Sequence, residues 1–307
     1  MNEGMGLCIL CPGQGDQHPR MMQLVQEEAA AKVVFEEATE ALGEDPRDWL
    51  LTPREFYRNR FAQPLLCVAQ LATWTVLRGM LPAPRLFAGY SIGELAAYGC
   101  ADAVGCRELT LLARRRALLM ESATAIPSGL LAVSGLGRDQ VERLCQGEEA
   151  QIAIVNARDR FVLGAAQACI RELQQAVERQ GGRATPLAVG VASHTAGLAS
   201  ASEAFRAILT DSALRAPMTP VLAGINGLPV YTREAAVETL ARQISTPLDW
   251  AACLNALPEM GCTLVLELGP GIALSRMARQ RWPEIPARSV EEFHSLAGVV
   301  EWVGRWL

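Results

Sequence analysis

A serine flanked by two glycines marks the stretch most able to carry out chemistry. In RLFAGYSIGELAAYG, residues 85–99, Ser91 stands in the pattern Gly-x-Ser-x-Gly. An apolar run ends at Gly89 and an Ala/Leu-rich segment follows, which predicts a strand, a sharp turn and a helix. Side chains at Gly89 and Gly93 would collide in such a turn. The pattern indicates a nucleophile, although a small residue in a tight strand-to-helix connection would look the same.

The start of the helix predicted after Ser91 can stabilise a negative charge. The first N–H groups of a helix have no acceptor within it, and they carry the positive end of its dipole. The Ile92 amide is therefore expected to donate to the oxyanion that forms when a serine attacks a carbonyl.

A serine nucleophile needs a general base, and the chain contains only three histidines. His294 lies in the polar stretch SVEEFHSLAG and is expected at the surface. His18, in GQGDQHPRM, could line a pocket, but Pro19 beside it indicates a turn. We favour His194, in VASHTAG, because it follows a predicted strand and its small neighbours leave space for an imidazole. No aspartate clearly completes a triad, so a Ser-His dyad is predicted.

Three successive arginines lie in LTLLARRRALLMESA, where apolar residues at helical spacing predict a half-buried helix. Successive side chains are about 100° apart on a helix, so at most one of Arg114, Arg115 and Arg116 should enter a pocket. An arginine facing the nucleophile would bind a substrate carboxylate through a fork of hydrogen bonds. The helical spacing does not show which of the three arginines faces the pocket.

Composition and charge narrow the classes of partner. The chain has 307 residues, of which 50% are hydrophobic and 20% charged, so it can bury a large core. A net charge of -5 without a long Lys/Arg block argues against nucleic acid or an anionic membrane as the main partner. No apolar run approaches the roughly 20 residues that cross a bilayer, and MNEGMGLCILCPGQG lacks the features of a signal peptide. A cytoplasmic protein is predicted.

The nine cysteines are scattered, which is typical of reduced thiols in a core. Cys8 and Cys11 form a C-x-x-C motif, but LCILC has the pattern of a strand, in which residues three apart point to opposite faces. No second pair of ligands accompanies them, so no metal site is predicted.

The order of elements predicts an α/β protein with a mostly parallel sheet. Strands at MGLCILC and RLFAGY alternate with helices at 22–42 and 62–80. Between residues 123 and 191 the order becomes β-α-β-β-α-β, the arrangement of ferredoxin-like domains. We therefore expect a compact insert at 123–191 within a main domain formed by residues 1–122 and 192–307.

Several stretches together resemble the malonyl-CoA:acyl-carrier-protein transacylase family. They are PGQGDQ (12–17), GYSIGELAA (89–97), the arginine of RRRALLM, IVNARDRFVLG (154–164), VASH (191–194), QISTPLDW (243–250) and ELGPG (267–271). The match runs in order over nearly the whole chain, which makes it far more specific than the serine pattern alone.

The resemblance implies an α/β-hydrolase-like core in which Ser91 is acylated by malonyl-CoA while His194 acts as base and then as acid. It implies that the backbone amides of Ile92 and Gln14 hold the oxyanion. In this family a backbone carbonyl usually takes the place of the triad acid. The resemblance implies no permanently bound cofactor, with malonyl-CoA as substrate and a phosphopantetheine-type thiol of a small acyl-carrier protein subunit as acceptor.

The resemblance also assigns three substrate-binding positions. The R-x-x-x-M ending aligns with Met120 and places the carboxylate-binding arginine at Arg116. Asn156 would lie at the domain cleft, and Gln243 would help to orient the site near His194.

Two residues depart from the family pattern. Tyr90 precedes the nucleophile where the family commonly has His, and Asp16 replaces a frequent Ser. GYSIGELAAYGCADA most resembles the transacylase (epsilon) subunit of bacterial malonate decarboxylase. That subunit transfers malonyl from malonyl-CoA onto the phosphoribosyl-dephospho-CoA group of a small carrier subunit. VASH is similar to the YASH of methylmalonyl-selecting domains, so a methyl-branched substrate remains an alternative.

We therefore expect a ping-pong malonyltransferase, with the malonate decarboxylase subunit as the main hypothesis. The first alternative is a malonyl-CoA transacylase of fatty-acid synthesis that acts on a phosphopantetheine carrier. A second alternative is a serine thioesterase or esterase, which would have the same Gly-x-Ser-x-Gly turn but would admit water to the acyl-enzyme. A non-catalytic carrier-docking subunit is disfavoured because Ser91, His194 and Arg116 are all present. The sequence assigns no role to His18 or Tyr90.

Overall fold

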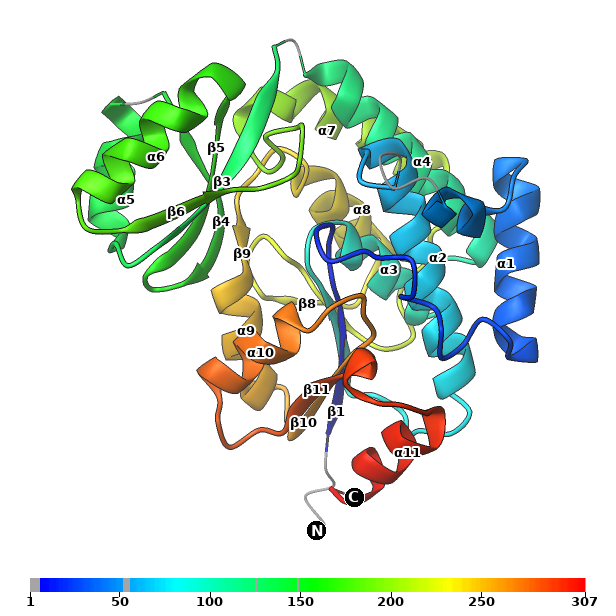
Figure 1. The fold of residues 1–307 in the computed structure, drawn as a ribbon. Coiled ribbons are helices and arrows are strands. Elements are labelled where there is room, and N and C mark those ends of the chain that lie inside the picture. The colour runs from blue at the N-terminus through cyan, green and yellow to red at the C-terminus, as the bar shows by residue number, and fades with distance from the viewer. Residues whose placement is uncertain (1–5, 52–55, 125, 148, 307) are drawn as a thin grey trace.

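The computed structural model describes residues 6–51, 56–124, 126–147 and 149–306, which form an α/β fold with two β-sheets (Figure 1). The six-stranded sheet has the order β11 (Ala287–Ser289), β10 (Leu264–Glu267), β1 (Leu7–Cys11), β2 (Leu86–Gly89), β7 (Val221–Leu222) and β8 (Pro229–Val230). Its pairings are parallel except that of β7 with β8. The mostly parallel sheet expected from the sequence is therefore present.

The five-stranded sheet has the order β6 (Arg183–Pro186), β3 (Ser128–Ser134), β5 (Arg160–Ala166), β4 (Gln151–Ala157) and β9 (Leu248–Asp249). Its first four strands alternate with α5 (Arg138–Gly147) and α6 (Ile170–Arg179) in the order β-α-β-β-α-β. The fifth strand, β9, comes from outside residues 123–191 and pairs in parallel with β4. The smaller sheet is thus joined by a backbone ladder to the segment that precedes α9 (Trp250–Glu259).

Helices cover both faces of the six-stranded sheet. One face packs against the layer of α1 (Ala29–Leu42), α2 (Asn59–Leu77), α3 (Ile92–Cys100), α4 (Cys106–Ala123), α7 (Ala199–Asp211), α8 (Arg233–Arg242) and α11 (Leu296–Gly304). The other face packs against α9 and α10 (Ala273–Arg281) and against side chains of the smaller sheet. Short 3₁₀ turns occur at Pro46–Leu51, Gln167–Cys169, Ala196–Leu198 and Val290–Glu292.

The residues of β1 show why this strand lies in the middle of the sheet. All five residues of LCILC are buried, as expected for a strand covered on both faces. Leu7, Ile9 and Cys11 belong to one core, whereas Cys8 and Leu10 belong to the core on the opposite face. The expectation that Cys8 and Cys11 point in opposite directions is confirmed.

Two helices differ from the sequence prediction. The first begins at Ala29 rather than at residue 22, because residues 18–28 form successive turns and Glu28 has an extended backbone with ψ 137°. The second spans Asn59–Leu77 rather than 62–80. Arg60 lies in its added first turn and pairs with Glu121 of α4 at 2.7 Å, a contact that the local sequence does not reveal.

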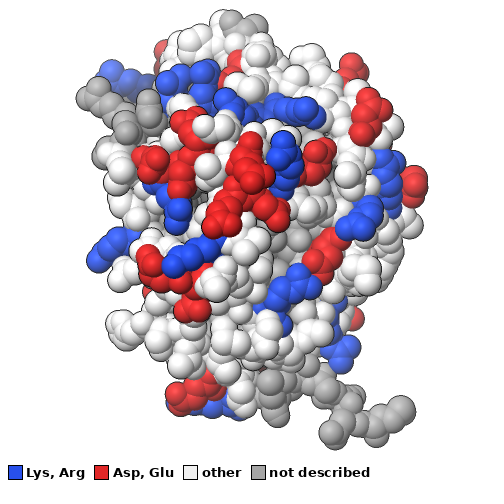
Figure 2. Space-filling view, turned by 90° about the vertical axis from the view of Figure 1, so that its right-hand side faces the viewer, with Lys and Arg blue, Asp and Glu red and all other residues white. Residues whose placement is uncertain are grey.

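The surface formed by α1, α2 and α4 carries basic and acidic side chains next to one another (Figure 2). Ion pairs join these helices, with Arg60 and Glu121 at 2.7 Å and Arg107 and Glu40 at 3.6 Å. Exposed pairs of this kind contribute at most about 1 kcal/mol each, so the stability of the fold rests on its cores. Within the described residues, no helix combines the length and the apolar content needed to cross a bilayer.

Candidate active site

Ser91 lies in the turn between β2 and α3, with φ 56° and ψ -117°. The two neighbouring glycines make this turn possible. A Cβ atom on Gly89 would lie 2.1 Å from the Glu94 amide nitrogen, and one on Gly93 would lie 2.0 Å from the Cys11 carbonyl oxygen. The Gly-x-Ser-x-Gly pattern therefore reflects a real steric constraint, and it holds a non-glycine residue at positive φ.

The hydroxyl of Ser91 lies beside an imidazole. Ser91 Oγ and His194 Nε2 are 2.8 Å apart, and His194 Nδ1 is 2.5 Å from the backbone carbonyl of Gln243. A carbonyl can only accept a hydrogen bond, so Nδ1 carries the proton and Nε2 is free to accept one. This chain of contacts gives the imidazole the tautomer that a general base requires.

His194 is buried, with 1% of its surface exposed. Burial lowers the pKa of its imidazole to about 3, and the nearby positive charge of Arg116 acts in the same direction. The hydrogen bond to the Gln243 carbonyl opposes this shift. The imidazole is therefore neutral at physiological pH and available as a base.

The structure separates the three arginines of α4. Arg115 is exposed, and Arg114 is partly buried and donates to the Leu42 carbonyl at 3.3 Å. Arg116 is 1% exposed and donates from Nη1 to Gln63 Oε1 and from Nη2 to Gln243 Oε1, both at 2.8 Å. Burial lowers the pKa of Arg116 to about 10, which leaves its guanidinium charged at neutral pH.

Gln243, at the end of α8, connects these groups. Its carbonyl accepts from His194, and its side-chain oxygen accepts from Arg116. Its side-chain nitrogen donates to the Ser91 carbonyl at 3.1 Å and to Glu94 Oε2 at 2.8 Å. One buried residue therefore contacts the serine, the imidazole and the arginine.

The two residues whose backbone amides the family resemblance names, Gln14 and Ile92, line one cavity. A cavity of about 70 Å³ is lined by Ser91, His194, Gln14 and Ile92, together with Asn59, Gln63, Tyr90, Met120, Leu130, Ile154, Val162, Leu187, Val189 and Ser193. Ile92 is the first residue of α3, so its amide has no acceptor within the helix. The side chain of Gln14 is occupied elsewhere, since its Nε2 donates to the Tyr57 carbonyl at 2.7 Å.

Three of the sequence-derived residues lie outside the lining of this cavity. Arg116 contacts it through Gln63, and Gln243 contacts it through Ser91. Asn156, on β4, accepts a hydrogen bond from the Tyr90 hydroxyl at 3.0 Å. The Tyr90 ring packs edge-on against Trp250, with ring centroids 5.4 Å apart. Tyr90 follows β2 of the larger sheet and bonds to Asn156 on β4 of the smaller sheet, so Tyr90 connects the two sheets.

The other two histidines lie elsewhere. His18 pairs with Glu291 at 2.8 Å, and both histidines line a separate cavity of about 460 Å³. His294 is exposed, as the sequence predicts. His18 therefore lies apart from Ser91, and His194 is the histidine that contacts the serine.

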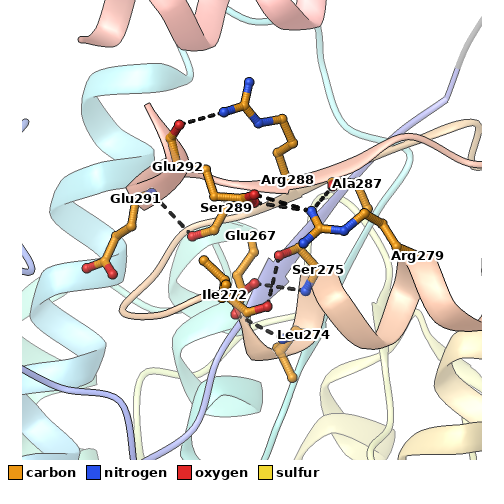
Figure 3. A network of polar contacts seen from close by, with 10 residues as sticks. All are labelled: Glu267, Ile272, Leu274, Ser275, Arg279, Ala287, Arg288, Ser289, Glu291 and Glu292. Carbon is orange, nitrogen blue, oxygen red and sulfur yellow. Dashed lines mark hydrogen bonds and ion pairs between the residues drawn. The ribbon is translucent and has the colours of Figure 1, made fainter. Parts of the chain in front are cut away.

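A polar network joins the end of β10 to α10 and β11 (Figure 3). Glu267, at the end of β10, is fully buried and accepts from the amides of Leu274 at 3.2 Å and Ser275 at 2.8 Å, which satisfies the start of α10. Burial raises the pKa of the Glu267 carboxyl to about 7. The same network joins β11 and α10 through Ser289, Glu292 and Arg279.

The loop between β10 and α10 supports the loop that carries Gln14. Gly271 has φ 80°, and a Cβ atom there would lie 2.6 Å from the side chain of Asp16. The ELGPG and GQGDQ stretches are therefore in close contact, although more than 200 residues separate them in the printed sequence.

Sequence reasoning missed Gln63 and Glu94. Both are polar residues in apolar helical segments, RFAQPLLCVAQLA and IGELAAYG. A buried polar side chain in such a segment requires a hydrogen-bond partner, and this requirement could have marked both residues as members of a polar network. Within the described residues, no group of three or more His, Cys, Asp or Glu side chains is arranged to hold a metal ion.

Comparison with known sequences gives one family over nearly the whole chain. The model of the acyl transferase domain family matches residues 9–293. The malonyl CoA-acyl carrier protein transacylase of Mycobacterium bovis is 30% identical over 296 residues, which cover 93% of this chain and 96% of the relative.

Solved structures agree with this match. The structure of FabD from Acinetobacter baumannii superposes with a TM-score of 0.92 at 26% identity, with 99% of each chain covered. A malonyl-transacylase solved in complex with its type II PKS acyl-carrier protein has a TM-score of 0.90 at 27% identity, with 96% of this chain and 99% of that chain covered.

Replacing Gly93 by Ala tests the steric constraint at the turn. We expect the free energy of unfolding, measured by urea denaturation, to fall by about 3 kcal/mol, because the new Cβ would overlap the Cys11 carbonyl. Gly79→Ala is the matched control, since no atom lies within 4 Å of its added Cβ. Its effect should stay within about 0.5 kcal/mol. Equal losses of unfolding free energy in the two variants would show that the turn at Gly93 has room for a side chain.

The low pKa of His194 predicts how Ser91 reactivity depends on pH. The rate of serine acylation by an activated acetyl ester, followed as the burst of released alcohol, should change less than about twofold between pH 7 and pH 5. A base with an ordinary pKa of 6.5 would lose about twentyfold over this range. Ser91→Ala gives the background. A loss above about tenfold would show that the imidazole is not held neutral.

Proposed function

Since the chain belongs to the acyl transferase domain family, we propose that it moves a malonyl group from malonyl-CoA to the thiol of an acyl-carrier protein. The observation that carries this proposal is the contact of Ser91, His194 and the Gln243 carbonyl, with the buried cation Arg116 in the same network. The names of the similar proteins support the same activity.

In the first half-reaction Ser91 Oγ attacks the thioester carbonyl while His194 Nε2 takes its proton. The backbone amides of Ile92 and Gln14 hold the oxyanion of the tetrahedral intermediate. The carbon–sulfur bond then breaks, and His194 returns the proton to the departing sulfur. The products are the malonyl-serine ester and free CoA.

In the second half-reaction the thiol of the carrier gives its proton to His194 and attacks the ester carbonyl. The bond between the acyl carbon and Ser91 Oγ breaks, and the imidazole returns the proton to the serine. The enzyme regains its starting state, which is the signature of a ping-pong reaction.

Arg116 binds the distal carboxylate of the malonyl group. Within the described residues it forms no ion pair, and its side-chain partners Gln63 and Gln243 are neutral amides. A buried guanidinium with neutral partners attracts an anion strongly, and it retains N–H donors beyond the two in use. The small volume of the adjoining cavity supports a short acyl group over a long one.

Asn156 contacts the incoming substrate, whereas Gln243 acts on it through neighbouring residues. Because Asn156 Oδ1 accepts from Tyr90, its amide nitrogen is left to donate to the incoming thioester or carrier arm. Gln243 keeps His194 and Arg116 in register with the serine.

We assign residues 1–122 and 192–307, with the six-stranded sheet, to an α/β-hydrolase-like core. We assign residues 123–191, with the first four strands of the smaller sheet, to a ferredoxin-like subdomain. The strand order β6-β3-β5-β4 with α5 and α6 on one face supports the second assignment. Nucleophilic Ser91 at the end of a central parallel strand supports the first.

The similar proteins favour an acyl-carrier protein of the fatty-acid synthesis type over the malonate decarboxylase carrier that the stretch GYSIGELAAYGCADA suggested. Offering the malonyl-enzyme both carriers side by side separates these possibilities. Release of free malonate in place of carrier-bound malonate would instead favour a thioesterase.

Ser91→Ala tests the covalent intermediate. After mixing with malonyl-CoA, intact-protein mass spectrometry should find the malonyl adduct on the unchanged protein and none on the variant, because the attacking oxygen is absent. An adduct that persists on the variant would assign the nucleophile to another residue.

Arg116→Ala tests the choice of acyl group. The ratio of malonyl to acetyl loading should fall by about a hundredfold or more, the equivalent of losing one charged hydrogen-bonded pair of about 3 kcal/mol. Arg115→Ala is the matched control on the same helix, because Arg115 is exposed, and it should leave the ratio unchanged. Unaltered malonyl preference in Arg116→Ala would remove this arginine from the substrate site.

A further inference from the structure

Glu94 is a buried acid that the reaction described above does not use. It lies in the first turn of α3, three residues after Ser91, and is 0% exposed. Its Oε2 accepts from the Gly224 amide at 3.0 Å and from Gln243 Nε2 at 2.8 Å. Within the described residues, its other oxygen, Oε1, has no hydrogen-bond partner. A buried carboxylate with one unsatisfied oxygen is costly and needs a compensating charge.

That charge lies on the other side of a single amide group. The side chain of Gln243 donates to Glu94 and accepts from Arg116, so it stands between an acid and a cation. Both charged groups are almost completely buried, where electrostatic interactions are weakly screened. The orientation of the Gln243 amide, with nitrogen toward the acid and oxygen toward the cation, favours both charges.

The other titratable groups around Glu94 and Arg116 are neutral near pH 7. Burial raises the pKa of Tyr98 on α3 and of Cys253 on α9, which both face Glu94. Burial also raises the pKa of Cys67 on α2, which faces Arg116, and lowers that of His194. Within the described residues, Glu94 is therefore the acid positioned to balance Arg116 while the acyl site is empty.

We propose that Glu94 is the counterion of Arg116 in the unloaded enzyme, and that it takes up one proton when the malonyl carboxylate occupies Arg116. This inference rests on the proposed malonyl transfer. Glu94 is a positioning residue, because it acts on the substrate through Gln243 and Arg116 rather than by contact. The proton enters from solvent during malonyl loading and returns to solvent when the malonyl group leaves for the carrier.

The physical reason is competition for one positive charge. A malonyl carboxylate in direct contact with the guanidinium neutralises it, and Glu94 then loses the favourable field that kept it ionised. Burial already raises the pKa of Glu94 to about 7, with hydrogen bonds from Gly224 and Gln243 and the charge of Arg116 acting against this shift. Loss of the last contribution raises the pKa further, so the proton binds near neutral pH.

Malonyl loading is expected to become less favourable as pH rises. Above pH 7 the unloaded enzyme has an ionised Glu94, whereas the malonyl-enzyme holds a proton there, so loading consumes a proton. The equilibrium constant for malonyl-CoA plus enzyme going to malonyl-enzyme plus CoA should therefore fall as pH rises above 7. The limit for one proton is tenfold per pH unit.

The test measures that equilibrium constant between pH 6 and pH 8 by quantifying acylated and free enzyme with intact-protein mass spectrometry. Acetyl-CoA is the internal control, because the acetyl group has no distal carboxylate but releases the same CoA thiol. The ratio of the malonyl constant to the acetyl constant should be flat below pH 7 and fall several-fold from pH 7 to pH 8.

Glu94→Gln removes the titrating group and keeps the shape of the side chain. In this variant the ratio should be independent of pH. A flat ratio in the unchanged protein, or an equal fall in Glu94→Gln, would overturn the inference. Absence of any malonyl adduct at every pH would instead refute the proposed function. The acetyl comparison in the unchanged protein decides the matter even if the variant does not fold.

Discussion

The hydrogen bonds of Gln243 hold the functional groups of this protein in one arrangement. Its backbone carbonyl fixes the tautomer of His194, and its side chain joins Arg116 to Glu94 and to the Ser91 carbonyl. Buried polar groups require partners, and here one residue supplies four of them. Because Gln243 contacts both His194 and Arg116, the imidazole and the guanidinium cannot move independently, and the fold sets the distance between them.

Desolvation acts on every member of this network toward its neutral form. It lowers the pKa of His194 to about 3 and that of Arg116 to about 10, and it raises that of Glu94 to about 7. The three groups respond differently at neutral pH because their ordinary pKa values differ. The imidazole is available as a base, the guanidinium keeps its charge, and the carboxyl group is close to its titration point.

Local patterns predicted most of the elements, and long-range contacts account for the differences. Alternation of strands and helices predicted the parallel sheet, and the β-α-β-β-α-β order between residues 123 and 191 matches the observed elements. The extended backbone at Glu28 delays the start of the first predicted helix to Ala29. The second helix is shifted three residues toward the N-terminus, and its first turn carries Arg60, which pairs with Glu121. The addition of β9 to the smaller sheet depends on a pairing with β4 that no local pattern encodes.

The sequence by itself determined the strand, turn and helix at Ser91, because the collision that requires Gly89 involves the backbone of the same turn. The collision that requires Gly93 involves the Cys11 carbonyl of β1 and is a tertiary contact. The sequence also determined that one arginine of three could face inward, since this follows from helical spacing. The sequence favoured His194, and the family resemblance named Arg116 and Gln243, but only the tertiary structure decided how these residues contact one another and Ser91. His194 is 103 residues from Ser91 and Gln243 is 152, and contacts across such separations depend on how the helices and sheets pack, which no short stretch of sequence specifies.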